Sequence, residues 1–234
     1  MILPPLIKGT LIKRYKRFLS DVRLESGEKV TAFTPNTGSM MGCSQPESPV
    51  RLSFQNNPNR KYSHTLELVY ANNTWVGVNT NVPNILVREA IEQGVIPELA
   101  GYDTIRPEVR YGENSRIDLL LSRGDDPCYV EVKNVTLVRN GVAAFPDAVT
   151  ARGAKHLREL VTEIEKGNRG VMVYIVQRED GTVFRPAEDI DPFYVRTLRQ
   201  ALNSGIEMLA YQARVNEKEI TVRRKLPIEI DFNA

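Results

Sequence analysis

The sequence has few of the residues on which several common kinds of functional site depend. Its 234 residues include only two cysteines and two histidines. Cys43 and Cys128 are too few and too isolated for a disulfide framework or a cysteine-type zinc site. We therefore expect both thiols to be reduced, as they are in the cytoplasm.

Long apolar runs and nucleotide-binding motifs are missing as well. No apolar run approaches the roughly 18 residues that are needed to cross a membrane, and the N-terminus lacks the pattern of a signal peptide. No Walker loop, no Gly-x-Gly-x-x-Gly motif and no internal repeat occurs. The sequence therefore predicts a cytoplasmic protein without membrane contact, and it argues against P-loop and dinucleotide-binding sites.

Charge is distributed unevenly along the chain, although the net charge is only +2. Residues 1–80 contain ten basic and five acidic side chains, whereas residues 81–234 carry a small excess of acids. A basic first part and a mildly acidic second part predict two domains. The polyanion-binding surface is then expected in the first.

The first 80 residues consist of short β-rich runs separated by turn residues. Strands are predicted near residues 6–12, 17–24, 29–34, 50–55, 65–70 and 74–79. About five short strands in a segment of this length indicate a small closed barrel, most simply an OB-fold.

Basic and aromatic side chains alternate at the end of the first predicted strand. Lys13, Arg14, Tyr15, Lys16 and Arg17 combine cations that suit phosphates with a ring that suits a base. We expect nucleic-acid contact here. The alternative is a solvated basic strand end whose aromatic side chains lie in the barrel core.

A segment without a regular pattern, residues 35–43, is rich in small and turn residues. Its backbone amides and hydroxyls could cradle a phosphate. A plain structural loop explains the same residues.

Residues 115–133 predict two strands joined by a tight turn at 124–127. A turn centred there places Asp118 opposite Glu131, with Lys133 on the same face and the apolar residues on the other. Two opposed carboxylates repel each other unless a divalent cation such as Mg²⁺ or Mn²⁺ lies between them. Acid followed by Glu-x-Lys is the pattern of PD-(D/E)xK nucleases. An exposed hairpin with an ordinary mixture of charges remains the alternative.

After residue 81 the pattern changes to helices that alternate with strands. Helices are predicted over residues 82–94, 148–166 and 191–203, with strands at 105–111, 170–176, 206–213 and 219–225. In the first helix Glu89 interrupts an apolar stripe that includes Ile85, so it either ligates a metal or forms a salt bridge. In the second, Val149 belongs to the predicted buried side. Arg152 and His156 lie one turn apart and could reach a phosphate near the paired acids.

Taken together, these residues resemble the sugar fermentation stimulation protein A (SfsA) family. The matching segments are 14–19 (RYKRFL), 35–38 (PNTG), Met40, 42–43 (GC), 111–112 (YG), 115–118 (SRID), 129–133 (YVEVK), 145–150 (FPDAVT), 152–153 (RG) and 155–160 (KHLREL). The resemblance implies an N-terminal OB-fold, a C-terminal PD-(D/E)xK nuclease-like domain and DNA binding. Ile117 replaces the proline that often precedes the first acid of the nuclease pattern.

We therefore expect an α+β protein with an OB-fold β-barrel in residues 1–80 and a nuclease-like α/β domain with a mixed sheet in residues 81–234. Two functions remain open. In a metal-dependent nuclease, Asp118 and Glu131, with Glu89 as a further candidate, would hold Mg²⁺ or Mn²⁺. Lys133 would then orient the attacking water, and Arg152 or His156 would bind the scissile phosphate. The alternative is a non-catalytic DNA-binding regulator of sugar metabolism genes. DNA is the expected partner in both, with RNA as a second possibility.

Overall fold

Six short strands form from the β-rich runs that asparagine, proline and glycine separate in the first 80 residues. They are β1 (Leu6–Tyr15), β2 (Leu19–Leu24), β3 (Lys29–Phe33), β4 (Pro49–Phe54), β5 (His64–Ala71) and β6 (Thr74–Gly77). The computed structural model describes residues 1–112 and 115–231. The strand order is β3-β2-β1-β4-β5-β6, and a parallel pairing of β3 with β5 closes the first five strands. The predicted OB-fold barrel is confirmed.

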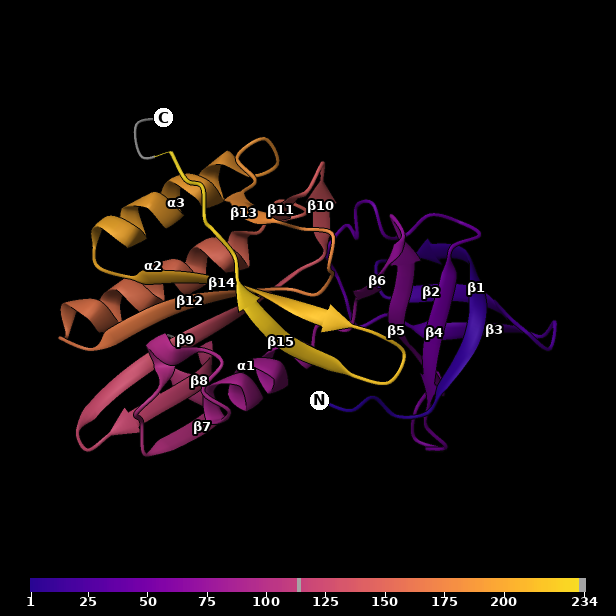
Figure 1. The fold of residues 1–234 in the computed structure, drawn as a ribbon, viewed down its shortest axis with the longest axis horizontal. Coiled ribbons are helices and arrows are strands. Elements are labelled where there is room, and N and C mark those ends of the chain that lie inside the picture. Colours follow the sequence, from indigo (N-terminus) through magenta and orange to yellow (C-terminus); the bar gives the residue numbers. More distant parts are fainter. Residues whose placement is uncertain (113–114, 232–234) are drawn as a thin grey trace.

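The rest of the chain builds a second domain around a mixed six-stranded sheet (Figure 1). Its elements are α1 (Val82–Glu92), a short 3₁₀ helix (Pro97–Leu99), β7 (Thr104–Tyr111), β8 (Ser115–Arg123), β9 (Asp126–Val135), α2 (Ala151–Glu165), β12 (Arg169–Val176), α3 (Pro192–Asn203), β14 (Glu207–Val215) and β15 (Ile220–Lys225). The order is β15-β14-β12-β9-β8-β7, with β12 parallel to both β9 and β14. The predicted α/β domain with a mixed sheet is confirmed.

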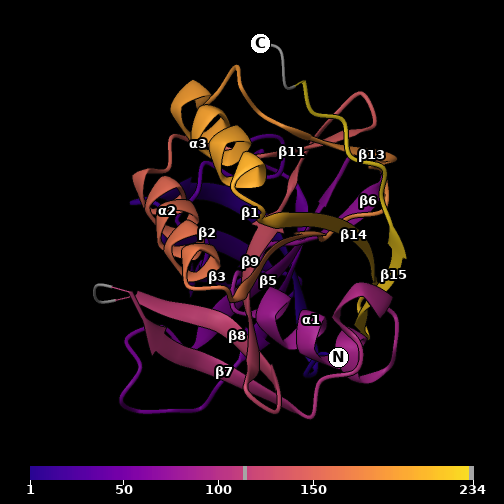
Figure 2. The same ribbon diagram turned by 90° about the vertical axis from the view of Figure 1, so that its left-hand side faces the viewer.

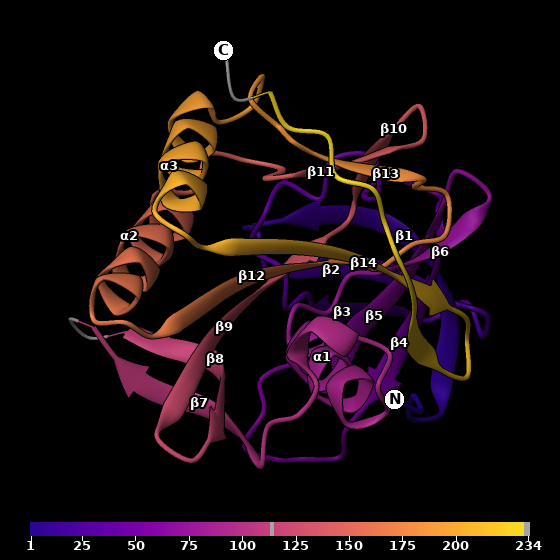
Figure 3. The same ribbon diagram turned by 60° about the vertical axis from the view of Figure 1, so that its left-hand side comes forward.

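Helices cover both faces of this sheet (Figure 3). On one face, α1 packs against apolar residues of β8, β9 and β12, including Leu119 and Val130. On the other face, α2 and α3 lie side by side (Figure 2) and enclose a second core that contains Ile117 and Leu120. The apolar residues of the 115–133 hairpin therefore divide between two cores, so the predicted division into one charged and one apolar face is wrong. A sheet covered on both sides needs apolar residues on both.

Three further strands were not predicted because they contain only three or four residues each. They are β10 (Leu137–Arg139), β11 (Val142–Phe145) and β13 (Val183–Pro186), and they form a small separate sheet. This sheet lies beside the barrel in Figure 1, and the Arg139 guanidinium is 3.0 Å from the Met41 sulfur in the barrel domain. The small sheet therefore belongs to the contact between the domains.

The start of α2 lies later than predicted, with a consequence for the residues before it. The Thr150 hydroxyl caps the helix by accepting a hydrogen bond from the Gly153 amide at 3.0 Å, so the helix begins at Ala151. Val149 consequently lies outside the helix. Its side chain is 78% exposed, and its predicted place on the buried side is wrong.

The buried face of α1 also differs from the predicted stripe. Val82, Leu86 and Ala90 are among its buried residues, whereas Ile85 is 40% exposed. The predicted stripe therefore lies one helical position away from the face that is buried. A short helix with few apolar residues defines the direction of its buried face poorly.

Direct hydrogen bonds hold the two domains together. The Asp147 carboxylate accepts from the buried Met40 amide at 2.8 Å, and the Asp147 carbonyl accepts from the Ser39 hydroxyl. On another side of the contact, the Gly77 amide donates to the Gln177 carbonyl at 2.9 Å. A Cβ atom at Gly77 would lie 2.4 Å from Gln177 Oε1, so a larger residue would have to displace the Gln177 side chain. In the described ranges no helix has the length and apolar character to span a membrane.

We expect Asp147→Ala to lower the free energy of unfolding by about 1–3 kcal/mol, because the buried Met40 amide would lose its acceptor. Chemical denaturation measures this effect. Asp189→Ala is the matched control, since it removes an exposed acid paired with Arg139 and should cost at most about 1 kcal/mol. An equal decrease in the free energy of unfolding in the two variants would show that the Asp147 hydrogen bonds do not hold the domains together.

Candidate functional site

The β8–β9 hairpin brings the predicted acids together in the predicted register. Paired positions run from Leu119 with Val130 to Arg123 with Asp126, and one further step places Asp118 against Glu131. The regular ladder ends at this step, because the Asp118 carboxylate itself accepts a hydrogen bond from the Val132 amide at 2.8 Å. The Asp118 carboxylate thus takes the place of a backbone carbonyl as the acceptor for the Val132 amide, at the point where the two strands separate.

Asp118 accepts a hydrogen bond on each of its carboxylate oxygens, and the negative charge of Glu131 acts on it. Asn84 of α1 donates its side-chain amide to Asp118 Oδ1 at 2.8 Å, in addition to the Val132 amide on Oδ2. Burial, followed by the negative charge of Glu131, raises the pKa of Asp118 to about 6. Removing a proton from Asp118 therefore brings a second negative charge next to a buried one.

Glu131 is the most deeply buried acid of the site, with 1% of the residue exposed. Its Oε1 accepts from the Lys133 ammonium at 2.6 Å and also contacts His156 Nδ1. Burial alone would raise the pKa of Glu131, but Lys133 and His156 outweigh it and the pKa is lowered. The other oxygen, Oε2, is buried and has no hydrogen-bond partner among the described residues. Glu131 is thus an ionised carboxylate, and its Oε2 accepts no hydrogen bond from the described residues.

The predicted proximity of α2 to the acids is observed for His156. This residue is 6% exposed, and its ring lies between Glu131 and Arg152, whose Nε is 3.3 Å from His156 Nε2. An acceptor at Nε2 leaves the proton of a neutral ring on Nδ1, where it faces Glu131. His156 therefore positions Glu131, while phosphate binding by Arg152 or His156 stays a prediction.

Glu89 does not join this site, and its candidacy as a metal ligand is not supported. Its carboxylate accepts from the Met1 ammonium at 2.5 Å, which is the salt-bridge alternative. Five residues separate Glu89 from Asn84, which is about 7.5 Å along the helix and roughly 140° around it. Asn84 therefore faces Asp118, and Glu89 points elsewhere.

The basic segment at the end of β1 has two different parts. Arg14 donates to the backbone carbonyls of Arg17 at 2.5 Å and of Asn36 and Gly38 at 2.8 Å each, and burial lowers its pKa. Tyr15 donates to Asp21 at 3.0 Å. Arg14 thus holds the barrel loops, and Tyr15 contacts β2. Both side chains already have protein partners, and their contact with nucleic acid stays a prediction.

The remaining cations of this segment lie at the surface. Lys16 and Arg17 are exposed in the turn between β1 and β2, and both have positive φ angles. Lys13 is 63% exposed and lies 3.6 Å from Asp21. Contact of these three cations with nucleic acid stays a prediction.

Four backbone amides of the 35–43 loop are already engaged. Those of Gly38 and Met41 donate to side chains within the loop, that of Met40 donates to Asp147, and that of Cys43 donates to the Met40 carbonyl. A phosphate cradle needs free amides. These four are unavailable, so the structural-loop alternative describes them.

A cleft with a volume of 360 Å³ lies between the domains, next to the acids. The barrel lines it with Arg17 and residues 36–38, and the second domain lines it with residues 145–150. Its other lining residues are Thr80, Pro83, Asn84, Val132, Lys133, Asn134 and Thr136. Asn84 and Val132 bind Asp118, and Lys133 binds Glu131, so the cleft adjoins the carboxylate site.

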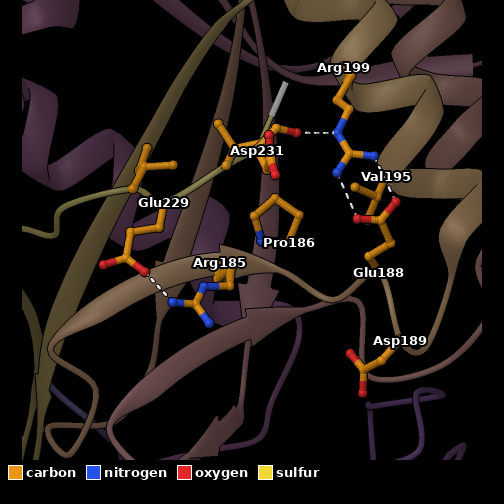
Figure 4. Close-up of a pocket in the computed structure, with 10 residues that line it drawn as sticks. Arg185, Pro186, Glu188, Asp189, Val195, Arg199, Glu229 and Asp231 are labelled. Carbon is orange, nitrogen blue, oxygen red and sulfur yellow. Dashed lines mark hydrogen bonds and ion pairs between the residues drawn. The ribbon is translucent and has the colours of Figure 1, made fainter. Parts of the chain in front are cut away.

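A larger hollow of 690 Å³ lies elsewhere, beside α3 (Figure 4). Its charged side chains are paired: Arg185 with Glu229, and Arg199 with Glu188 at 2.6 Å. Asp189 pairs with Arg139 at 2.6 Å. The charges of this surface are balanced in pairs, unlike the carboxylate of Glu131, so the interdomain cleft is the stronger candidate for a functional site.

Asn84, Asn134 and Asp147 were not predicted as parts of this region. The only sequence signal was the FPDAVT segment, which matched the family without an assignable chemistry. Asparagines on a helix or strand carry no signal by themselves, because only the packing of α1 and β9 brings them to the cleft.

The fold and the site together define a class of protein. An OB-fold barrel precedes a second domain, whose order is a helix, three antiparallel strands, a helix and a parallel strand. Two of the antiparallel strands carry Asp118 and Glu131-x-Lys133. This is the arrangement of a PD-(D/E)xK nuclease-like domain. Residues 12–78 match the family model of the SfsA N-terminal OB domain, and residues 81–219 match that of the sugar fermentation stimulation protein RE domain. The chain belongs to the sugar fermentation stimulation protein family.

Individual relatives agree along the whole chain. A sugar fermentation stimulation protein homolog of Geobacter sulfurreducens is 58% identical over 229 residues, covering 97% of this chain and 98% of the relative. The homolog of Brucella ovis is 53% identical over 232 residues, with 98% of each covered. The structure of Pyrococcus furiosus SfsA in complex with Ca²⁺ is 26% identical, with a TM-score of 0.90 and 98% of each chain covered.

We expect Arg14→Ala to lower the free energy of unfolding by about 2 kcal/mol or more, because charge-assisted hydrogen bonds to several loop carbonyls would be lost. Lys16→Ala removes an exposed cation two residues away and should change this free energy by no more than about 0.5 kcal/mol. Urea denaturation compares the two. A stable Arg14→Ala protein with weakened DNA binding would place Arg14 at the nucleic-acid interface.

Proposed function

We propose that this protein is a nuclease that acts on DNA and uses a divalent cation, Mg²⁺ or Mn²⁺, held by Asp118 and Glu131. The observation that carries the proposal is Glu131 Oε2, a buried oxygen of an ionised carboxylate that has no partner among the described residues and lies beside a second carboxylate. Buried carboxylates are normally paired or bound to a metal. The arrangement therefore has the chemistry of a cation site.

The donor set fits a hard cation. Asp118 and Glu131 offer carboxylate oxygens, which Mg²⁺, Mn²⁺ and Ca²⁺ all prefer. Asn84 and the Val132 amide orient Asp118, and His156 orients Glu131, so both ligands are held by groups behind them. The Pyrococcus furiosus relative was determined in complex with Ca²⁺, which supports a divalent cation in this family.

The residues around the acids suit phosphodiester hydrolysis. A bound cation would supply Lewis acidity and lower the pKa of a water molecule. The Lys133 ammonium lies 2.6 Å from Glu131 Oε1 and lines the cleft, where it can orient a water molecule or stabilise charge on a phosphate. The exposed Arg152, next to His156, can approach a phosphate from α2.

The first domain supplies the charge for binding nucleic acid. Its exposed Lys13, Lys16 and Arg17 lie on a domain with excess positive charge, and Arg17 also lines the cleft. Cations placed at the entrance to an active site attract a polyanion and hold its backbone. We infer that the barrel binds DNA and that the second domain cleaves it.

A second function, a DNA-binding regulator that does not cleave, is favoured by two observations. The Lys133 ammonium is engaged with Glu131, and in the described ranges no three histidine, cysteine, aspartate or glutamate side chains gather as a metal-binding group. The decisive experiment incubates the protein with single- and double-stranded DNA and RNA, with Mg²⁺, Mn²⁺ or EDTA. Metal-dependent cleavage supports the nuclease, and its absence on every substrate supports the regulator.

Metal affinity should depend on pH through Asp118, because the cation binds the ionised form. With a pKa of about 6, Asp118 is ionised at pH 7 and mostly protonated at pH 5, so Mn²⁺ affinity should fall about tenfold between them. Calorimetric titration measures this. Asp118→Asn should abolish binding, whereas Asp126→Asn, at the exposed hairpin turn, should retain it. Unchanged Mn²⁺ affinity in Asp118→Asn would refute the cation site.

Lys133→Ala separates catalysis from binding. We expect metal-dependent cleavage to fall by about a hundredfold or more, as for loss of one preorganised group in an active site. DNA affinity, measured in EDTA, should change little. Lys29→Ala removes an exposed cation from β3 with the same change in net charge and should leave cleavage unaltered. Equal cleavage rates in the two variants would remove Lys133 from the mechanism, provided that thermal melting shows both to be folded.

A further inference from the structure

We infer that the interdomain cleft binds an unpaired nucleotide of single-stranded DNA, so that the proposed nuclease acts on single strands or frayed ends rather than on intact duplex. This inference rests on the proposed function and names its substrate class. It also assigns a role to the two family segments whose chemistry the sequence left open, residues 35–43 and 145–150.

These two segments line the cleft from different domains and meet at its edge. Residues 36–38 line it from the barrel, and residues 145–150 line it from the second domain. Asp147 ties the walls together through the Met40 amide and the Ser39 hydroxyl. A Cβ atom at Gly38 would lie 2.6 Å from Asp147 Oδ1, so the walls are in direct contact at this point. The width of the cleft is thus set by hydrogen bonds within the protein.

The size of the cleft suits one nucleotide. Its volume of 360 Å³ lies at the lower end of the range for small-molecule sites, about 300–1,000 Å³. A DNA duplex is much larger, since its major groove alone is about 12 Å wide. A recess of this size admits one nucleotide that is unpaired or turned out of the stack more readily than a base pair.

The chemistry of the lining matches a nucleotide. Arg17 lines the cleft and is a cation that suits a phosphate. Asn134 Oδ1 accepts from Gln177 at 2.8 Å, which leaves its Nδ2 as a buried donor without an acceptor in the described ranges. A base or phosphate oxygen would satisfy that donor. Val149 of the 145–150 segment is exposed and adds an apolar surface to the cleft, against which a base can pack.

The cleft also leads to the reacting groups. Asn84 and Val132 line it and bind Asp118, and Lys133 lines it and binds Glu131. A strand that places one nucleotide here brings a phosphate next to the proposed cation site. A blunt duplex would have to unpair its end first, at a cost of a few kcal/mol.

Fluorescence anisotropy in EDTA tests this inference without requiring cleavage. The probes are one labelled single-stranded oligodeoxynucleotide and the same sequence closed into a blunt hairpin duplex. We expect the single strand to bind about tenfold more tightly. Thr37→Glu, which adds a negative charge to an exposed position in the cleft wall, should weaken single-strand binding about tenfold, or roughly 1.4 kcal/mol.

Three further variants complete the test. Thr104→Glu makes the same change at an exposed threonine of β7, outside the cleft, and should leave single-strand affinity unchanged. Val149→Glu repeats the test on the 145–150 segment, and Asn134→Ala removes the buried side-chain donor of β9. Both should weaken binding of the single strand more than binding of the duplex. Circular dichroism confirms that each variant is folded.

The outcomes separate this inference from the proposed function. Equal affinity for single strand and duplex, or equal effects of Thr37→Glu and Thr104→Glu, overturns the inference even if the protein cleaves DNA. Preferential single-strand binding that Thr37→Glu and Val149→Glu weaken supports the inference even if no metal-dependent cleavage is found. In that case only the proposed nuclease activity fails.

Discussion

Glu131 is a charged side chain in an almost completely buried position, and such a charge is tolerated only where neighbouring groups replace the water it has lost. Lys133 and His156 do so for one of its oxygens. This requirement links two elements, because α2 must lie close enough to β9 for the imidazole to reach the carboxylate. The other oxygen has no partner in the part of the chain that the structure describes, so the interaction that stabilises Glu131 leaves one oxygen with its lone pairs unused.

The contact between the domains depends on a second acid in an equally specific place. Asp147 accepts from a backbone amide of the barrel and lies against Gly38, so the barrel loop and the 145–150 segment are held in one arrangement. The barrel is therefore more than a binding module on a linker. Its loop completes a wall of the cleft into which Lys133 faces, and this joins the basic surface of the first domain to the carboxylates of the second.

Much of this arrangement could be predicted from local patterns. Alternation within residues 115–133 predicted the register that brings Asp118 to Glu131, because a tight turn determines which residues of a hairpin are paired. Strand and turn signals predicted the OB barrel for a similar reason. The structure adds most where a residue type has two possible uses. Arg14 has the composition of a nucleic-acid ligand but binds loop carbonyls, and Glu89 has that of a metal ligand but binds an ammonium group.

The sequence by itself determined the two-domain order, the barrel, the hairpin and the identity of the acid–acid–lysine set, since all of these follow from patterns within short stretches of chain. Only the tertiary structure decided that Glu131 is buried, that Asn84 rather than Glu89 faces Asp118, and that residues 35–43 and 145–150 form two walls of one cleft. These features depend on contacts between residues far apart in the chain. Burial, hydrogen-bond partners and pKa are properties of such contacts, so no local pattern contains them.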